Sequence, residues 1–246
     1  MYTFSSKLKT FSFVLMLVGI LGIGYGFLTA PKDIQEVEQL LKADSHGDHH
    51  AAANTESHDA HAAAGHDAHA DAEHKAHLEH VLHQLQNKPW AAFYVACIFF
   101  MLVSLGVLVF YAIQQVAQAG WSPVLFRVMQ GITSYLPVGS VIFFIFLLLC
   151  GFHMNHLFIW LDPEVVAHDK LIQAKAGYLN FPFWIIRAAI FLLGWSAYQY
   201  FSRKNCLAQD ESNDNSFYKK NFNISAMFLV FFIVTESIMS WDWIMS

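Results

Sequence analysis

The sequence predicts an all-α integral membrane protein with about five transmembrane helices. Of its 246 residues, 56% are hydrophobic and only 13% are charged, which is about half the charged share of an average soluble domain. The apolar residues gather in five blocks, each long enough for the roughly 20-residue helix that crosses a hydrocarbon core of about 30 Å. Continuous apolar runs indicate helices, because a helix satisfies its own backbone hydrogen bonds in lipid.

The first block is expected to remain in the protein as a transmembrane helix, residues 1–30. Its basic flank, Lys7 and Lys9, is also typical of a cleavable signal peptide. However, its apolar run of about 18 residues exceeds the 7–15 residues of a signal core, and a cleavage after Ala30 would find Leu28 where a small residue is needed. The five expected spans are Phe11–Ala30, Pro89–Ala117, Ile132–Trp160, Pro182–Phe201 and Phe222–Met245.

Residues 31–88 are expected to form a long loop rich in histidine, alanine and acidic residues. Eleven of the 14 histidines lie between His46 and His83, and many follow an H-x-x-H spacing. On a helix this spacing places imidazoles on one face, and neutral imidazole binds zinc, copper or nickel. The alternative is a solvated low-complexity linker whose histidines have no ligand. The candidate ligands of a weak metal site are His58, His61, His66 and His69.

The charges of the loops predict a cytoplasmic N-terminus. Cytoplasmic loops carry an excess of Lys and Arg, and the connection between the fourth and fifth spans contains Arg203–Lys204 and Lys219–Lys220. Residues 31–88 and 161–181 then face outward. The outward side carries nearly as many lysines, but most of them lie in the long loop, where the rule weakens.

Several charged or titratable residues lie within or close to the last three spans. A charge inside a bilayer costs roughly 3 kcal/mol or more, so it persists where it pairs, faces a bundle interior or lines a path. In the predicted orientation these groups converge on the outer third of the membrane. The candidates for a proton path or a quinone pocket are His153, His156, Arg187, Glu236 and Asp242.

Two interpretations of these candidates remain open. In the functional one, a quinol oxidised nearby gives a proton to an imidazole, and a carboxylate passes it outward. In the structural one, Arg187 pairs with Glu236 and the histidines sit at the membrane interface. Asp242, which lies between two tryptophans, is then an interfacial anchor in an aromatic belt.

Cysteine spacing argues against a metal cofactor held by thiolates of this chain. Cys97, Cys150 and Cys206 are isolated and form no C-x-x-C, haem-attachment or iron–sulfur pattern. Any electron transfer is therefore expected to use metal centres on other subunits.

Three segments resemble a known family: MYTFSSKLKTFSFVLMLVGILGIGYGFL, WLDPEVVAHDKLIQAKAGYLNFPFWIIR and SIMSWDWIMS. They are similar to the ActF-type integral membrane subunit of alternative complex III, the bacterial quinol:cytochrome c oxidoreductase. This subunit is of the NrfD/polysulfide-reductase membrane-anchor type. The resemblance covers nearly the whole chain apart from the His-rich loop. It implies a peripheral first helix plus a four-helix transmembrane bundle, residues 89–246.

In that family the DWIMS segment lies in the middle of the chain, and a second four-helix bundle follows it. The resemblance therefore implies a native protein that continues beyond Ser246. A site shared between the two bundles would need the second one.

The resemblance also implies the partners and the cofactors. The expected partners are an ActC-type sister membrane subunit, a multihaem cytochrome and a periplasmic iron–sulfur subunit, in the bacterial inner membrane. Haem and iron–sulfur clusters are expected on those partners, and a quinone or quinol is the expected small molecule. A terminal oxidase is a further candidate partner, lipid surrounds the spans, and no nucleic acid is expected. Quinol oxidation is associated chiefly with the ActC-type bundle, so no catalytic residue is assigned to this chain.

Two other functions remain open. The His-rich loop suggests a metal-ion transporter subunit, but no span carries His paired with Asp or Glu at i,i+4 to hold a metal in the membrane. A purely structural assembly subunit is the other alternative. It differs from the respiratory hypothesis only in that Glu236 and the outward polar cluster have no role in proton transfer.

Overall fold

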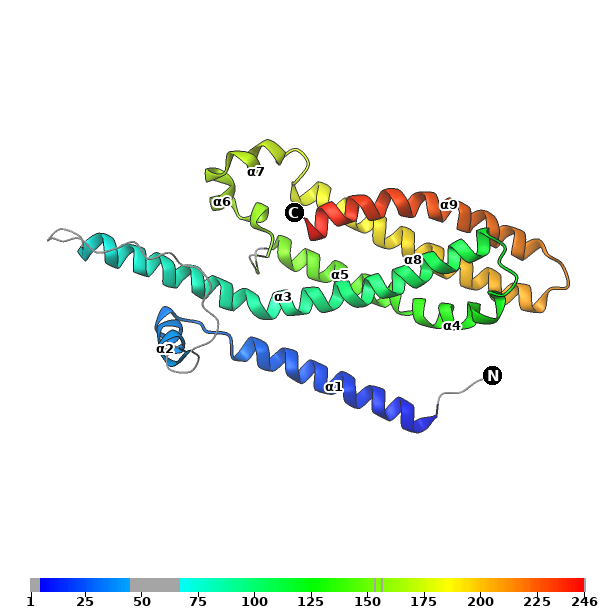
Figure 1. Cartoon of the computed structure of the whole chain (residues 1–246), viewed down its shortest axis with the longest axis horizontal. Helices are drawn as coiled ribbons and strands as arrows, with labels where there is room; N and C mark the ends of the chain where they lie inside the picture. The colour runs from blue at the N-terminus through cyan, green and yellow to red at the C-terminus, as the bar shows by residue number, and fades with distance from the viewer. Residues whose placement is uncertain (1–4, 45–66, 153, 156, 246) are drawn as a thin grey trace. The chain divides into compact units, whose positions relative to one another are not determined.

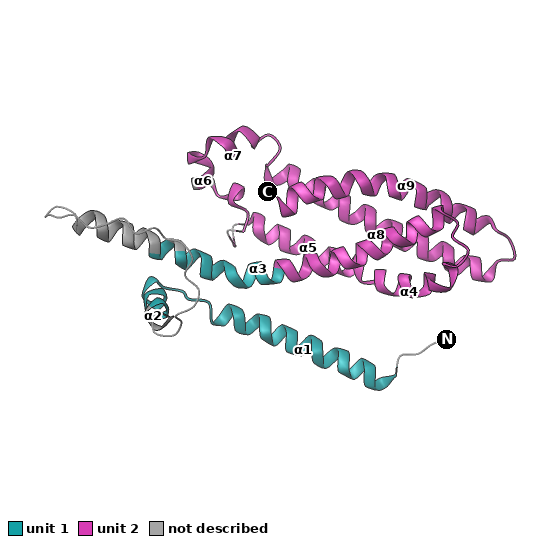
Figure 2. Ribbon diagram, viewed as in Figure 1, with its two compact units in different colours: residues 1–93 teal, residues 94–246 magenta. Residues whose placement is uncertain are grey.

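A computed structural model of the chain describes residues 5–44, 67–152, 154–155 and 157–245. Nearly all of these residues are helical (Figure 1), and five helical segments among them are long and apolar enough to cross a membrane. The predicted fold class, an all-α multi-pass membrane protein, is confirmed. The chain divides into two units, residues 1–93 and 94–246 (Figure 2), and each is described by itself.

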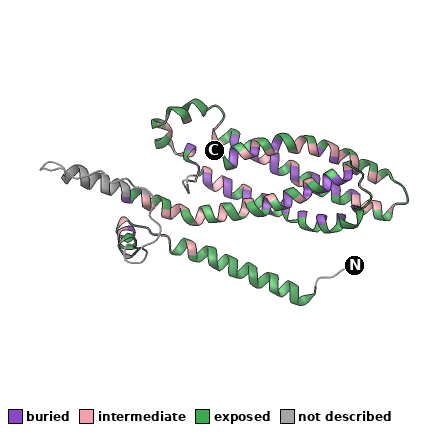
Figure 3. Ribbon diagram, viewed as in Figure 1, coloured by how far each residue is buried: buried purple, intermediate pink, exposed green. Residues whose placement is uncertain are grey.

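The first unit holds α1 (Ser6–Leu28), α2 (Ile34–Asp44) and the start of α3 (Asp67–Val116). The side chain of Ser5 accepts a hydrogen bond from the backbone N–H of Leu8 at 3.4 Å, which satisfies one of the unpaired donors at the start of α1. α1 is apolar on all sides and buries none of its residues (Figure 3). Such a helix needs lipid or other subunits to cover it.

Helix α3 is much longer than a membrane crossing requires. Its 50 residues extend about 75 Å at 1.5 Å per residue, against a core of about 30 Å. It begins at Asp67, so residues 67–88 and Ile34–Asp44 are helical where a loop was expected. Both stretches are rich in Ala, Glu, Gln and Leu, which favour helix. Pro89 lies within α3 and removes one backbone hydrogen bond there.

The second unit is a bundle of four spans. They are the remainder of α3; α4 (Pro123–Thr133) with α5 (Tyr135–Gly151); α8 (Phe181–Glu211); and α9 (Ser216–Met239) with its continuation η2 (Ser240–Ile244). Large side chains fill the space between these helices. Those that are fully buried include Trp184, Trp195, Tyr111, Phe143 and Phe146. Figure 3 shows buried residues concentrated in this unit.

The third span lies earlier in the sequence than expected. The helix covers Pro123–Gly151 rather than Ile132–Trp160, with a break at Ser134. Pro137 accounts for the break, because it has no N–H to donate to the carbonyl of Thr133 and its ring crowds that carbonyl. After Gly151 the chain leaves the helix, and the short 3-10 helix η1 (Ile159–Leu161) buries Trp160.

Two short helices complete the connection to α8. They are α6 (Pro163–His168) and α7 (Lys170–Lys175). The carboxylate of Asp169 accepts from the N–H groups of Leu171 and Ile172 at 2.8 and 3.4 Å and so caps α7.

Candidate functional site

Arg187 and Asp242 form a buried ion pair at the end of the bundle where α8 begins and η2 ends. Arg187 Nε donates to Asp242 Oδ2 at 2.7 Å, and Nη2 donates to Oδ1 at 2.9 Å. The two side chains are 8% and 0% exposed. Removing each charge from water costs several kcal/mol, which only good geometry and further hydrogen bonds offset. This bidentate arrangement is the strong form of such a pair.

The third guanidinium nitrogen, Nη1, also has a hydrogen-bond acceptor. Nη1 donates to the carbonyl oxygen of Tyr178 at 3.2 Å, and the rings of Tyr178 and Phe183 lie 4.0 and 4.3 Å from Cζ, within cation–π range. Desolvation, the hydrogen bond with Asp242 and the charge of that carboxylate raise the pKa of the Tyr178 hydroxyl. Tyr178 therefore keeps its proton at neutral pH and serves as a donor and a ring surface.

Local sequence at the start of α8 places Arg187. The side chain of Asn180 caps the helix by accepting from the N–H of Phe183 at 3.0 Å, and Pro182 stands in the first turn, as is common at helix starts. Asn180 also donates to the carbonyl of Gly177 at 3.0 Å. Arg187 follows about 9 Å along the helix.

Asp242 lies in the π-helix η2, on the face of α9 that also buries Thr235 and Met239. The N–H of Met245 donates to the carbonyl of Ser240 at 3.0 Å, the i→i+5 bond of a π-turn. Asp242 and the adjacent Trp243 are both buried, at 0% and 2% exposure. Isolated π-turns are frequent at functional sites.

Aromatic side chains hold this helix end. Trp184 Nε1 donates to the carbonyl of Asp242 at 3.3 Å, and the hydroxyl of Tyr94 donates to the carbonyl of Trp243. The last carbonyls of a helix lack helical donors, so these two bonds act as caps. The Trp243 ring lies 4.8 Å from that of Phe143, centroid to centroid. The site is thus a charged pair enclosed by aromatic rings.

Glu236 lies apart from this pair. It is half-buried on α9, and its carboxylate forms no hydrogen bond or ion pair with any residue that the structure describes. The expected pairing of Arg187 with Glu236 is wrong, since Asp242 occupies the guanidinium group. The interpretation of Asp242 as an interfacial anchor is also wrong, because its side chain is fully buried.

The remaining sequence candidates lie outside the described side chains. His153, His156, His58, His61 and His66 are not among the described residues. His69 lies in the part of α3 for which only the backbone is described. In the described part of the chain, no group of three or more His, Cys, Asp or Glu residues could hold a metal ion.

Further buried polar side chains lie on α8 beyond an apolar stretch, residues 188–194, and together with Arg187 we call them the polar row. Its members on α8 are Arg187, Trp195, Tyr198, Gln199, Ser202 and Asn205, all less than 9% exposed. Besides Arg187, two of them and the half-buried Ser196 bind neighbouring helices. The hydrogen-bonded pairs are Trp195–Thr235 (3.0 Å), Ser196–Ser140 (3.3 Å) and Tyr198–Ser225 (2.7 Å).

The polar row ends in a cluster around Tyr111. Its hydroxyl oxygen accepts from Asn221 Nδ2 at 2.8 Å, Gln115 Nε2 at 3.1 Å and Gln130 Nε2 at 3.5 Å, which joins α3, α4 and α9. The buried oxygens Gln115 Oε1 and Asn221 Oδ1 find no donor among the described residues. Buried acceptors of this kind are ordinarily satisfied by internal water, so the cluster is suited to binding water.

Sequence reasoning missed most of these contacts. Gln115 lies within an expected span, so the depth argument that selected Arg187 could also have selected it. Gln130 and Asn221 lie just outside the expected third and fifth spans and carry no such signal. Tyr178 and Trp184 carry no such signal, because aromatic residues are common near membrane interfaces for other reasons.

Comparison with protein-family models finds no match, and comparison with curated proteins finds none either.

Proposed function

We propose that this chain is a non-catalytic membrane subunit of a quinol:cytochrome c oxidoreductase complex, or of one with another periplasmic acceptor. It scaffolds the complex and provides part of a proton path. The observation that carries the proposal is the polar row. Arg187 and Asn205, its two end members, lie about 27 Å apart along α8 at 1.5 Å per residue, close to the hydrocarbon thickness of about 30 Å; the apolar residues 188–194 separate Arg187 from the other members. Ionisable and polar groups at such depth are costly and usually functional.

The two carboxylates have different roles in this proposal. Glu236 has no partner in the described part of the chain, so it is suited to take up and release a proton. Asp242 is fixed by Arg187, so it holds η2 against α8. The hydroxyl and amide groups of the polar row supply hydrogen-bonding partners for water along the path.

The respiratory assignment rests on the resemblance of three sequence segments to the ActF-type subunit. By that resemblance the partners are an ActC-type membrane subunit, a multihaem cytochrome and an iron–sulfur subunit in the bacterial inner membrane. The N-terminus lies in the cytoplasm. The fully exposed apolar surface of α1 is compatible with subunits packed around it.

Isolation of the tagged chain from its native membranes in mild detergent tests the assignment. We expect haem absorption bands in the purified sample and quinol-dependent reduction of cytochrome c. A purified chain without haem and without this activity would overturn the respiratory assignment.

Substitution Glu236→Gln tests the proton path in the assembled complex. We expect fewer protons released per electron transferred, with unchanged haem content, because glutamine cannot carry the proton. The exposed neighbouring substitution Ser237→Ala is the control and should leave proton release unchanged. Full assembly with unchanged turnover and proton release in Glu236→Gln would favour a purely structural subunit.

A further inference from the structure

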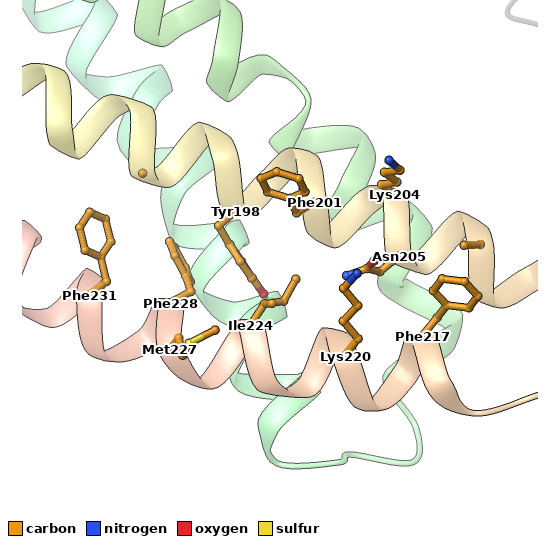
Figure 4. A pocket seen from close by; sticks show the side chains of 12 residues that line it. Tyr198, Phe201, Lys204, Asn205, Phe217, Lys220, Ile224, Met227, Phe228 and Phe231 are labelled. Carbon is orange, nitrogen blue, oxygen red and sulfur yellow. The ribbon is translucent and has the colours of Figure 1, made fainter.

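A groove between α8 and α9 has features of a lipid-binding site (Figure 4). It encloses about 520 Å³ and lies towards the ends of the two helices that their short connection joins. Tyr198 and Phe228 line it with stacked rings whose centroids are 3.9 Å apart. The groove therefore has a rigid aromatic floor.

The charges in the groove are all of one sign. Lys204 of α8 and Lys220 of α9 line it at the end nearest the connection, and both are exposed. None of the described residues that line it is acidic. In Figure 4, Lys220 extends from α9 towards Asn205 on α8. Lysines near a membrane surface attract anionic headgroups, and their long stems let the ammonium reach the interface.

The apolar part of the groove has the length of one membrane leaflet. Along α9, the distance from Lys220 to Phe231 is about 17 Å at 1.5 Å per residue, and half the hydrocarbon core is about 15 Å. Met227 and Phe231 line this part. At its far end the Phe231 ring lies over Gly194, where an added Cβ would come within 2.5 Å of the ring. The groove thus runs from a charged end to an apolar end about one leaflet thickness away.

We propose that this groove binds one anionic phospholipid, with its phosphate between Lys204 and Lys220 and an acyl chain lying along Met227 towards Phe231. A zwitterionic lipid offers no net negative charge to the two lysines. Inorganic phosphate would leave the apolar half unfilled. The positive charge at one end suits a phosphate group, and the apolar part has the length of an acyl chain in one leaflet. These two features favour a lipid over a protein helix.

Native mass spectrometry of the full chain, released from bilayers of mixed phosphatidylglycerol and phosphatidylcholine, tests this proposal. We expect retained phosphatidylglycerol, and about tenfold less of it in the double variant Lys204→Gln/Lys220→Gln. The matched control is Arg203→Gln/Lys219→Gln, which removes the same charge from exposed residues outside the groove and should retain the lipid. Inorganic phosphate in excess should not displace it.

A second pair of variants tests the apolar half. Met227→Trp fills the groove from an exposed position and should reduce lipid retention, whereas Val230→Trp, exposed on α9 outside the groove, should not. If the two charge variants lost equal amounts of phosphatidylglycerol, the lipid would be held by a general basic surface, and the proposed site would be overturned. Retention in Lys204→Gln/Lys220→Gln, displacement by phosphate alone, or no effect of Met227→Trp would also overturn it.

Discussion

Arg187 shows how a charge is kept inside this bundle. Its guanidinium group makes two bonds to Asp242 and one to the Tyr178 carbonyl, and two aromatic rings cover it. These contacts come from three segments, so the residue joins the start of α8, the preceding loop and η2. A buried ion pair with these hydrogen bonds is stable as long as both partners are present. Removal of either one leaves an uncompensated charge in the interior.

Substitution Arg187→Gln should lower the free energy of unfolding by about 3–5 kcal/mol, because it leaves the Asp242 carboxylate buried without a cation. Arg187→Lys should cost less, since it keeps the charge but loses the bidentate geometry. The double variant Arg187→Met/Asp242→Leu should recover much of the stability. Thermal unfolding in detergent, followed by circular dichroism, measures these differences.

The exposed substitution Arg203→Gln is the control for this series. It should change stability by no more than about 0.5 kcal/mol. If Arg187→Gln were as stable as this control, the buried ion pair would not contribute to the bundle.

At the scale of elements, α8 is the helix that organises the bundle. Its buried residues recur along its whole length from Trp184 to Asn205, and they face both α5 and α9. Two glycines permit close approach. A Cβ at Gly151 at the end of α5 would collide with Phe181, and one at Gly194 would meet Phe231. Small residues at helix contacts are typical of packing in membranes.

The free energy of unfolding of Gly194→Ala should therefore be about 1–3 kcal/mol lower than that of Gly106→Ala, because the added methyl group overpacks the contact with Phe231. Gly106 is the matched control, since it lies inside α3 and an added Cβ there meets nothing within 4 Å. Both changes gain the same intrinsic helix propensity, so their difference in thermal stability isolates the contact with Phe231. Adding Phe231→Leu should reduce the difference; equal stabilities would contradict close α8–α9 packing.

At the scale of the whole molecule, the bundle has two polar ends joined by the polar row. One end carries Arg187 and Asp242, and the other carries the cluster around Tyr111. Between them lie hydrogen-bonded pairs within an otherwise aromatic interior. These bonds link α8 to α9 along the interior of the bundle.

The orientation of the bundle can be measured by labelling single cysteines with a membrane-impermeant maleimide. In a chain whose Cys97, Cys150 and Cys206 are replaced by serine, Lys175→Cys should react in intact spheroplasts. Asn213→Cys should react only after lysis, because α8 separates the two positions and the basic connection is predicted to be cytoplasmic. The reverse pattern would invert the orientation, and equal labelling would contradict a crossing by α8.

Sequence by itself determined the class of this protein, the number of its spans and the position of Arg187 and Glu236 within apolar runs. These follow from composition and from the length of apolar runs, because lipid imposes the same cost on every backbone and every charge. It placed helix ends less well: the third span was shifted, and part of the long loop proved helical.

Only the tertiary structure decided which carboxylate meets Arg187. Glu236 and Asp242 are both acidic residues on one apolar segment, and the sequence alone does not say which face of that segment is buried. In the structure Asp242 shares the buried face of Thr235 and Met239, seven and three residues before it. The loop that brings Tyr178 over the guanidinium group completes the site. The contact between Arg187 and Asp242 joins residues 55 positions apart, and no local pattern in the sequence encodes its geometry.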